Sequence, residues 1–182
     1  YCGAGSSGRI AVQDGVELFP TFSWPQSRIE YIIAGGHEAL TKSIENSEDN
    51  LGEANKEVLK VNVNSGDVVI CLAASSQTPF TLEVLRLSKI NGALTIGIGN
   101  NPHGKIQKIS DHGITLDTGF EIVAGSTRLK AGTAQKICLN LISTLVMCNL
   151  GHVKNGEMIH FVPMNKKLRI RKKIMIKKLK SN

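Results

Sequence analysis

Residues 3–9 read Gly-Ala-Gly-Ser-Ser-Gly-Arg, and this stretch decides the fold. Glycines at this spacing permit a sharp backbone turn and bring main-chain N–H groups close to a bound anion. Ser6 and Ser7 add hydroxyl donors that suit phosphate oxygens. Such a loop normally follows a β-strand and opens a helix whose N-terminus also faces the anion. We therefore expect a phosphate-binding loop after a first strand reduced to Tyr1 and Cys2, and a chain that begins partway into its fold.

The rest of the chain alternates short segments rich in Ile and Val with helix-like segments. The expected strands are residues 28–34, 67–73, 93–99 and 112–116, and the expected helices are residues 9–16, 37–47, 51–60 and 79–91. With the first strand, this alternation predicts an α/β fold, a three-layer sandwich in which a five-stranded parallel sheet lies between helices. A long apolar helix over residues 125–150 follows, with Ser126 as its N-cap and Gly151 as its C-terminal stop.

Parallel sheets of this kind bind ligands beyond the carboxyl ends of their strands. Two further segments at such positions carry hydroxyl groups where a predicted helix starts. They are residues 74–79, which include Ser75, Ser76 and Thr78, and residues 125–127. One such segment alone is usually a simple helix cap, but three together favour a phosphate monoester as the ligand.

The spacing of Gly3, Gly5 and Gly8 also matches the dinucleotide-binding fingerprint Gly-x-Gly-x-x-Gly. That alternative requires an acid at the end of the second strand to hold a ribose. Glu30 has about the right spacing, but it falls early in its expected strand, which ends in Ala-Gly-Gly. The paired serines also favour a terminal phosphate over a bridging pyrophosphate, so the dinucleotide alternative ranks lower.

The net charge of +7 is concentrated at the C-terminal end. Residues 166–182 hold nine Lys and Arg residues and no acid, so residues 1–165 carry a net charge of −2. A basic run can bind nucleic acid or an anionic membrane, but the solvated face of a terminal helix is the favoured interpretation. We expect one domain over residues 1–164 and a basic helical tail over residues 165–182. No apolar run reaches about 18 residues, so we do not expect a membrane span. With the tail interpreted as a solvated helix face, we expect neither nucleic acid nor membrane as a partner.

Cysteine, histidine and carboxylate patterns limit the chemistry. The four cysteines form no Cys-x-x-Cys pair and the five histidines no i,i+4 pair, so no metal site is expected. Their apolar neighbours favour buried free thiols in a reducing cytoplasm. Glu17 stands beside Val16 and Leu18, where an acid can serve as proton donor or base. Spacing alone explains Glu17 and the acids at positions 45, 48 and 49 equally well as solvated surface groups.

Four runs of sequence resemble the N-acetylmuramic acid 6-phosphate etherase family, a member of the sugar isomerase (SIS) domain superfamily. They are residues 3–9, residues 33–36 (Ile-Ala-Gly-Gly), residues 73–75 (Ala-Ala-Ser) and residues 125–136 (Gly-Ser-Thr-Arg-Leu-Lys-Ala-Gly-Thr-Ala-Gln-Lys). The last run is highly specific, and the resemblance covers about residues 1–168 in the same order and nearly the same spacing. It implies an SIS-type, flavodoxin-like sheet.

The resemblance implies a lyase that cleaves the D-lactyl ether of N-acetylmuramic acid 6-phosphate by elimination and water addition. The products would be N-acetylglucosamine 6-phosphate and D-lactate. The family's catalytic glutamates lie in Asp-Ala-Ser-Glu and Gly-Ala-Glu-Asp motifs, which match residues 14–17 and 46–49. Glu17 is then the expected proton donor and Glu48 the partnering acid or base. The expected contacts to phosphate and sugar are Ser6, Ser7, Gly8, Ser75, Ser76, Thr78, Ser126 and Lys130.

The same resemblance implies no metal or other cofactor, a cytoplasmic homodimer with sites close to the subunit interface, and a role in peptidoglycan recycling. The chain departs from the family's Ala-Ala-Ser-Gly-Arg-Thr-Pro at Ser76, where the family has glycine, and at Gln77, where it has arginine. The second change removes a bidentate cation from the expected anion site. Two alternatives within the superfamily are a non-catalytic sugar-phosphate regulator, like the glucokinase regulatory protein, and a phosphosugar isomerase.

Overall fold

The computed structural model describes residues 1–163 and 165–180. The chain divides into two compact units. The first consists of Tyr1–Gln13 and Glu30–Cys138, and the second of Asp14–Ile29 and the described part of Leu139–Asn182. Helices α1 (Gly5–Val16) and α6 (Lys130–Asn149) each begin in the first unit and continue into the second.

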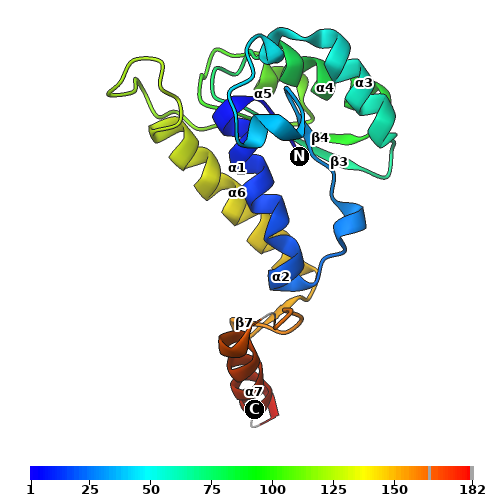
Figure 1. The fold of residues 1–182 in the computed structure, drawn as a ribbon, viewed down its shortest axis with the longest axis vertical. Helices are drawn as coiled ribbons and strands as arrows, with labels where there is room; N and C mark the ends of the chain where they lie inside the picture. Colours follow the sequence, from blue (N-terminus) through cyan, green and yellow to red (C-terminus); the bar gives the residue numbers. More distant parts are fainter. Residues whose placement is uncertain (164, 181–182) are drawn as a thin grey trace. The chain divides into compact units, whose positions relative to one another are not determined.

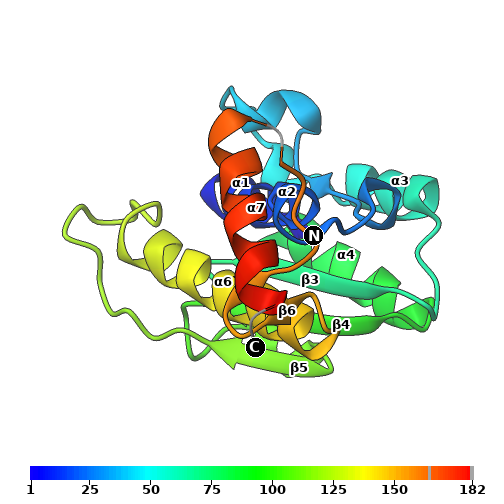
Figure 2. The same ribbon diagram turned by 90° about the horizontal axis from the view of Figure 1, so that it is seen from below.

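The first unit is built on a five-stranded parallel sheet with the strand order β2-β1-β3-β4-β5. Its strands are β1 (Cys2–Gly3), β2 (Ile32–Ile33), β3 (Val68–Ala73), β4 (Leu94–Gly99) and β5 (His112–Thr115). Cys2 pairs with Ile32 on one side and Cys71 on the other, so the short first strand lies inside the sheet. Figure 2 shows β3, β4 and β5 side by side. The parallel α/β fold expected from the sequence is confirmed.

Helices cover the sheet because each carries an apolar stripe. Helices α3 (Leu51–Val61) and α4 (Pro79–Ile90) lie side by side against one face, and α1 starts on the other (Figure 1). Phe80, at the start of α4, is completely buried. The core around it comprises Cys2, Ile32, Ala54, Val58, Cys71, Val84, Leu85 and Ile106. Burial of each large apolar side chain contributes about 1.5–3 kcal/mol to folding.

Two glycines let α1 start directly against the end of β1. A Cβ on Gly3 would lie 2.8 Å from the Gly8 nitrogen, and a Cβ on Gly8 would lie 2.8 Å from the Gly3 carbonyl oxygen. Real Cβ atoms do not approach backbone this closely, so both positions require glycine. Gly5 starts the helix with a positive φ of 52°. The glycine spacing of residues 3–9 is therefore a packing requirement of the strand–helix junction.

The predicted helix over residues 37–47 is wrong. This segment contains two short 3₁₀ turns, His37–Leu40 and Ser47–Asp49, with Asn46 in the left-handed conformation at a φ of 57°. Arg9, from α1, donates through Nε to the Ala39 carbonyl and through Nη2 to the Lys42 carbonyl, each at 2.9 Å. These tertiary hydrogen bonds hold the segment as a loop, because they engage carbonyls that a regular helix would use internally.

The long helix α6 begins at Lys130 and not near Ser126, so Ser126 is not its N-cap. The carboxylate of Glu121 accepts hydrogen bonds from the backbone N–H groups of Lys130 and Ala131, at 3.0 and 2.9 Å. It therefore satisfies donors at the start of the helix that an N-cap would otherwise serve. Gly151, with a φ of 80°, follows the end of α6 as expected.

The thiols differ in their surroundings. Cys2 and Cys71 are free and buried, as expected, and burial raises the pKa of the Cys2 thiol. Cys148, near the end of α6, is exposed, contrary to the expectation of burial. This helix is also long and apolar enough to cross a membrane by length and composition, with a mean hydropathy of 1.2. Core helices of soluble proteins meet the same criterion, so the finding is weak.

The second unit contains the end of α1, α2 (Leu18–Phe22), the end of α6, an antiparallel hairpin and a terminal helix. The hairpin pairs β6 (Val153–Lys154) with β7 (Glu157–Met158), and the terminal helix is α7 (Lys166–Lys180). Buried Asp14 accepts a hydrogen bond from the Ser143 hydroxyl at 3.2 Å. Within α7, Met175 is buried.

Candidate functional site

Helix α1 opens with the two serines at the carboxyl end of β1. Ser6 is partly exposed, whereas Ser7 and Gly8 are buried. Gly8 is also close to β2, since a Cβ there would lie 3.2 Å from Cγ2 of Ile33. The first turn of α1 therefore presents the Ser6 hydroxyl and helix N–H groups at the carboxyl end of the parallel strands, which is a favourable arrangement for an anion.

The loop after β3 places a second pair of hydroxyls at the start of α4. Exposed Ser75 accepts a hydrogen bond from the Gln77 N–H at 3.1 Å, and its Oγ lies 3.3 Å from Oγ1 of Thr78. Pro79 occupies the first turn of α4, where its missing N–H removes no helical hydrogen bond. The Thr78 side chain does not cap α4 within the described part of the chain. Both hydroxyls are thus available to a ligand at a helix N-terminus.

Ser76 differs from its neighbours because its side chain is fully buried. Its Oγ accepts hydrogen bonds from the Asn101 N–H and from Nε2 of Gln107, both at 3.1 Å. Its carbonyl oxygen accepts from the N–H groups of Lys105 and Ile106, at 2.9 and 3.1 Å. Ser76 therefore ties the loop after β3 to the loop after β4. Its backbone has a positive φ of 60°, the conformation that glycine adopts most easily.

A polar pocket of about 310 Å³ lies between the start of α1 and residues 42–48. Ser6, Arg9, Lys42 and Glu48 are among the residues that line it. Glu48 is exposed and sits in the 3₁₀ turn that follows Asn46. The fold thus brings Ser6 and Glu48, two predicted site residues far apart in sequence, to one pocket. Its lining carries both positive side chains, which can attract an anionic substrate, and negative side chains, which can act as acid or base.

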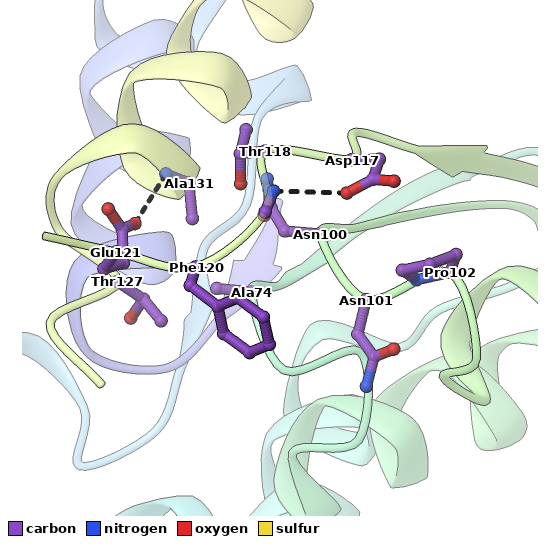
Figure 3. Close-up of a pocket in the computed structure, with 11 residues that line it drawn as sticks. Ala74, Asn100, Asn101, Pro102, Asp117, Thr118, Phe120, Glu121, Thr127 and Ala131 are labelled. Atoms are coloured by element: carbon purple, nitrogen blue, oxygen red, sulfur yellow. Dashed lines mark hydrogen bonds between the residues drawn. The ribbon is translucent and has the colours of Figure 1, made fainter. Parts of the chain in front are cut away.

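A second pocket, of about 410 Å³, lies at the carboxyl ends of β3, β4 and β5 (Figure 3). We call it the β4–β5 pocket; it is lined by Ala74, Asn100, Asn101, Pro102, Asp117, Thr118, Gly119, Phe120, Glu121, Thr127 and Ala131. Its back is held in place by Asn100, which donates to the Leu116 carbonyl and accepts from Nε2 of the buried Gln135, both at 3.0 Å. The pKa of Glu121 is lowered because its carboxylate accepts backbone hydrogen bonds from the start of α6, and the bond from the Ala131 N–H has the largest effect.

The sequence reasoning missed this pocket. Asn100 and Asn101 directly follow the predicted strand over residues 93–99, so the rule that ligands bind beyond strand ends would have found them. Phe120 and Glu121 carried no comparable signal, because their positions depend on how the loop after β5 reaches the start of α6.

Three further predicted site residues, Glu17, Ser126 and Lys130, are not among the lining residues of these two pockets. Glu17 belongs to the second unit, where it is exposed and immediately precedes α2. Ser126 is partly exposed in the turns before α6, and the Lys130 side chain is exposed. Among the described residues, no group of three His, Cys, Asp or Glu side chains is arranged to hold a metal ion.

Comparison with known sequences and folds agrees with this architecture, a parallel α/β domain with hydroxyl-bearing helix starts at the carboxyl ends of its strands. Residues 51–146 match the SIS domain profile, and residues 1–89 match the N-terminal SIS domain of the glucokinase regulatory protein. The chain belongs to the SIS domain family.

Among curated relatives, N-acetylmuramic acid 6-phosphate etherase from Deinococcus radiodurans is 44% identical over 176 residues, 97% of this chain and 58% of the relative. The Mycoplasma mycoides etherase is 41% identical over 181 residues, 100% of this chain and 60% of the relative. The chain therefore spans about three-fifths of the length of these relatives.

Solved structures share the fold at much lower identity. The C-terminal domain of glucosamine-fructose-6-phosphate aminotransferase from Francisella tularensis has a TM-score of 0.58 and 17% identity, covering 97% of this chain and 41% of that one. The Vibrio vulnificus NanR protein complexed with ManNAc-6P has a TM-score of 0.56 and 9% identity, covering 97% and 53%. At these identities the similarity concerns the fold alone.

Proposed function

We propose that the protein is a lyase that cleaves the D-lactyl ether of N-acetylmuramic acid 6-phosphate to N-acetylglucosamine 6-phosphate and D-lactate. The identity of 40–44% to etherases over 94–100% of the chain supports this activity. The observation that carries the proposal is the pocket that joins Ser6, at an anion-binding helix start, to Glu48. A phosphorylated substrate and an acid–base group can meet there.

The reaction would proceed by proton transfers at adjacent carbons. The open-chain aldehyde acidifies the proton on carbon-2, and a carboxylate removes it. The bond from carbon-3 to the ether oxygen then breaks, and D-lactate leaves as its oxygen takes a proton. Water adds across the double bond, hydroxyl to carbon-3 and proton to carbon-2. We assign Glu17 as the proton donor and Glu48 as the partnering acid or base. The aldehyde supplies the acidity, so the scheme needs no metal or other cofactor.

The phosphate would be held by the two hydroxyl-bearing helix starts. The start of α1 supplies Ser6 with the backbone at Ser7 and Gly8, and the start of α4 supplies Ser75 and Thr78. Ser76 would act by fixing this loop, since its side chain is buried. Ser126 and Lys130 would contact the sugar from the segment that opens α6. Because Gln77 is neutral, the part of this phosphate site at the start of α4 would rely on hydroxyls and backbone donors.

We also propose that the protein acts as a homodimer in the cytoplasm, in peptidoglycan recycling. An exposed apolar face on α6 supports an association between copies. Ile137, Leu141 and Leu145 recur every four residues and are each 55–60% exposed. Apolar residues repeated at this spacing form one stripe along a helix, which a second copy would remove from water.

Release of D-lactate from N-acetylmuramic acid 6-phosphate tests the activity. Loss of a positioned acid–base group costs roughly 10²–10⁴-fold in rate, so we expect Glu48→Gln to lose at least a hundredfold. Asp49→Asn is the matched control, because Asp49 is exposed, adjacent and outside the pocket lining. Equal activity of Glu48→Gln and Asp49→Asn would remove Glu48 from the mechanism.

A second candidate is a non-catalytic sugar-phosphate regulator. It is favoured by the match of residues 1–89 to the N-terminal SIS domain of the glucokinase regulatory protein. A regulator would be stabilised against heat by N-acetylglucosamine 6-phosphate yet release no lactate, whereas the etherase would show both.

A further inference from the structure

The β4–β5 pocket differs chemically from the places assigned to the phosphate and to Glu48. Carbon surfaces of Ala74, Pro102, Phe120 and Ala131 form part of its lining, together with side-chain amides, hydroxyls and the two carboxylates of Asp117 and Glu121. No Lys or Arg lines it within the described part of the chain. This mixture of apolar and polar groups is typical of a pocket for an organic ligand group without negative charge.

The two carboxylates of the lining reinforce this selectivity. Both oxygens of Glu121 accept backbone N–H groups of α6, and Oδ1 of Asp117 accepts the Gly119 N–H at 3.2 Å (Figure 3). Their charges remain at the pocket, while both oxygens of Glu121 and one oxygen of Asp117 already accept hydrogen bonds within the protein. A phosphate or a lactyl carboxylate would meet like charge there without a compensating cation. The pocket therefore disfavours anionic groups.

The pocket is continuous with the proposed phosphate loop. Ala74, which lines it, directly precedes Ser75, and the backbone N–H of Asn101 donates to Ser76. A sugar whose phosphate lies at Ser75 and Thr78 would therefore have ring substituents within reach of the β4–β5 pocket. The pocket volume of about 410 Å³ lies within the range of small-molecule sites.

Two side chains are suited to an amide that carries a methyl group. The Phe120 ring projects among the lining residues in Figure 3 and Phe120 is 99% exposed, so its apolar faces are open to a ligand. Oδ1 of Asn101 accepts the His103 N–H at 3.0 Å, which orients the side-chain amide with its NH₂ as the donor toward a ligand. The methyl group would pack against the Phe120 ring, and the carbonyl oxygen would accept a hydrogen bond from the Asn101 NH₂ group.

We propose that the β4–β5 pocket receives the acetamido group of an N-acetylated amino sugar 6-phosphate, with Phe120 as a specificity-determining residue. This inference rests on the proposed function for its phosphate anchor. It adds a reason why the protein selects acetamido sugars over sugars that carry a hydroxyl at carbon-2. Contact with one aromatic ring is worth about tenfold in affinity.

Titration calorimetry with N-acetylglucosamine 6-phosphate and glucose 6-phosphate tests the inference without requiring turnover. The wild-type chain is expected to prefer the acetamido sugar by at least tenfold. Phe120→Ala should lose about tenfold for the acetamido sugar and leave glucose 6-phosphate binding unchanged. Ile122→Ala is the matched control, because Ile122 lies in the same loop, is 91% exposed and does not line the pocket.

The fully exposed ring makes Phe120→Ala a clean variant, since its removal takes no packing from the unliganded fold. A wild-type chain without preference for the acetamido sugar overturns the inference, and so does an equal loss for both sugars in Phe120→Ala. The proposed etherase is judged separately by lactate release. An acetamido preference without lactate release would reject the etherase and keep the pocket assignment.

Discussion

Replacement of Ser76 by alanine and by glycine separates two opposing contributions at one buried position. The Ser76 hydroxyl accepts hydrogen bonds from the Asn101 N–H and from Nε2 of Gln107. Each substitution leaves these donors without their acceptor, which costs roughly 1–3 kcal/mol in the free energy of unfolding. The backbone φ of 60° acts in the other direction, because a side chain there is strained by about 1 kcal/mol relative to glycine.

We therefore expect the order of stability to be wild type, then Ser76→Gly, then Ser76→Ala. The alanine variant should lose about 2–3 kcal/mol and the glycine variant about 1 kcal/mol less than that. In a chain of this size, the alanine loss corresponds to a fall in Tm of roughly 4–12 °C. Urea unfolding followed by circular dichroism at neutral pH measures the free energy of unfolding of both variants. An alanine variant as stable as the wild type, or a glycine variant less stable than alanine, would refute the reasoning.

Two further predictions concern the core and the response to acid. Phe80→Ala should lower the free energy of unfolding by about 3–5 kcal/mol, because the ring is completely buried. Leu59→Ala is the control and should change this free energy little, since Leu59 is 76% exposed. Equal losses for the two variants in urea unfolding would contradict the prediction. The Lys89 ammonium and the hydrogen bonds from Thr95 hold the pKa of Asp111 well below its usual range, so in acid the native state binds fewer protons than the unfolded state and stability falls. Asp111→Asn should therefore be less stable than wild type at neutral pH, with a gap that narrows below about pH 4; a gap independent of pH would argue against the ion pair.

The regular elements were largely predictable because local sequence determines them. The apolar segments over residues 67–73 and 93–99 became β3 and β4 almost residue for residue, and the segments over 51–60 and 79–91 became α3 and α4. Pro79 and the glycines of the first loop act on the backbone within one or two residues, so their effect is visible in the sequence.

Two helix boundaries were not predictable, because distant residues decide them. The segment over residues 37–47 stays a loop where Arg9 engages the carbonyls of Ala39 and Lys42. Helix α6 starts at Lys130 because Glu121 satisfies its first N–H groups. Arg9 and Glu121 lie too far away in sequence for a local pattern to predict these contacts.

The candidate site shows the same division. The sequence by itself determined the parallel sheet, the glycine-rich start of α1 and the hydroxyl groups after β1 and β3, since these depend on alternation, glycine spacing and strand ends. Only the tertiary structure decided that Ser6 and Glu48 share a pocket, that Ser76 is buried while Ser75 stays exposed, and that Phe120 lines the β4–β5 pocket. Burial and hydrogen-bond partners are properties of packing between segments, and packing exists only once the chain has folded.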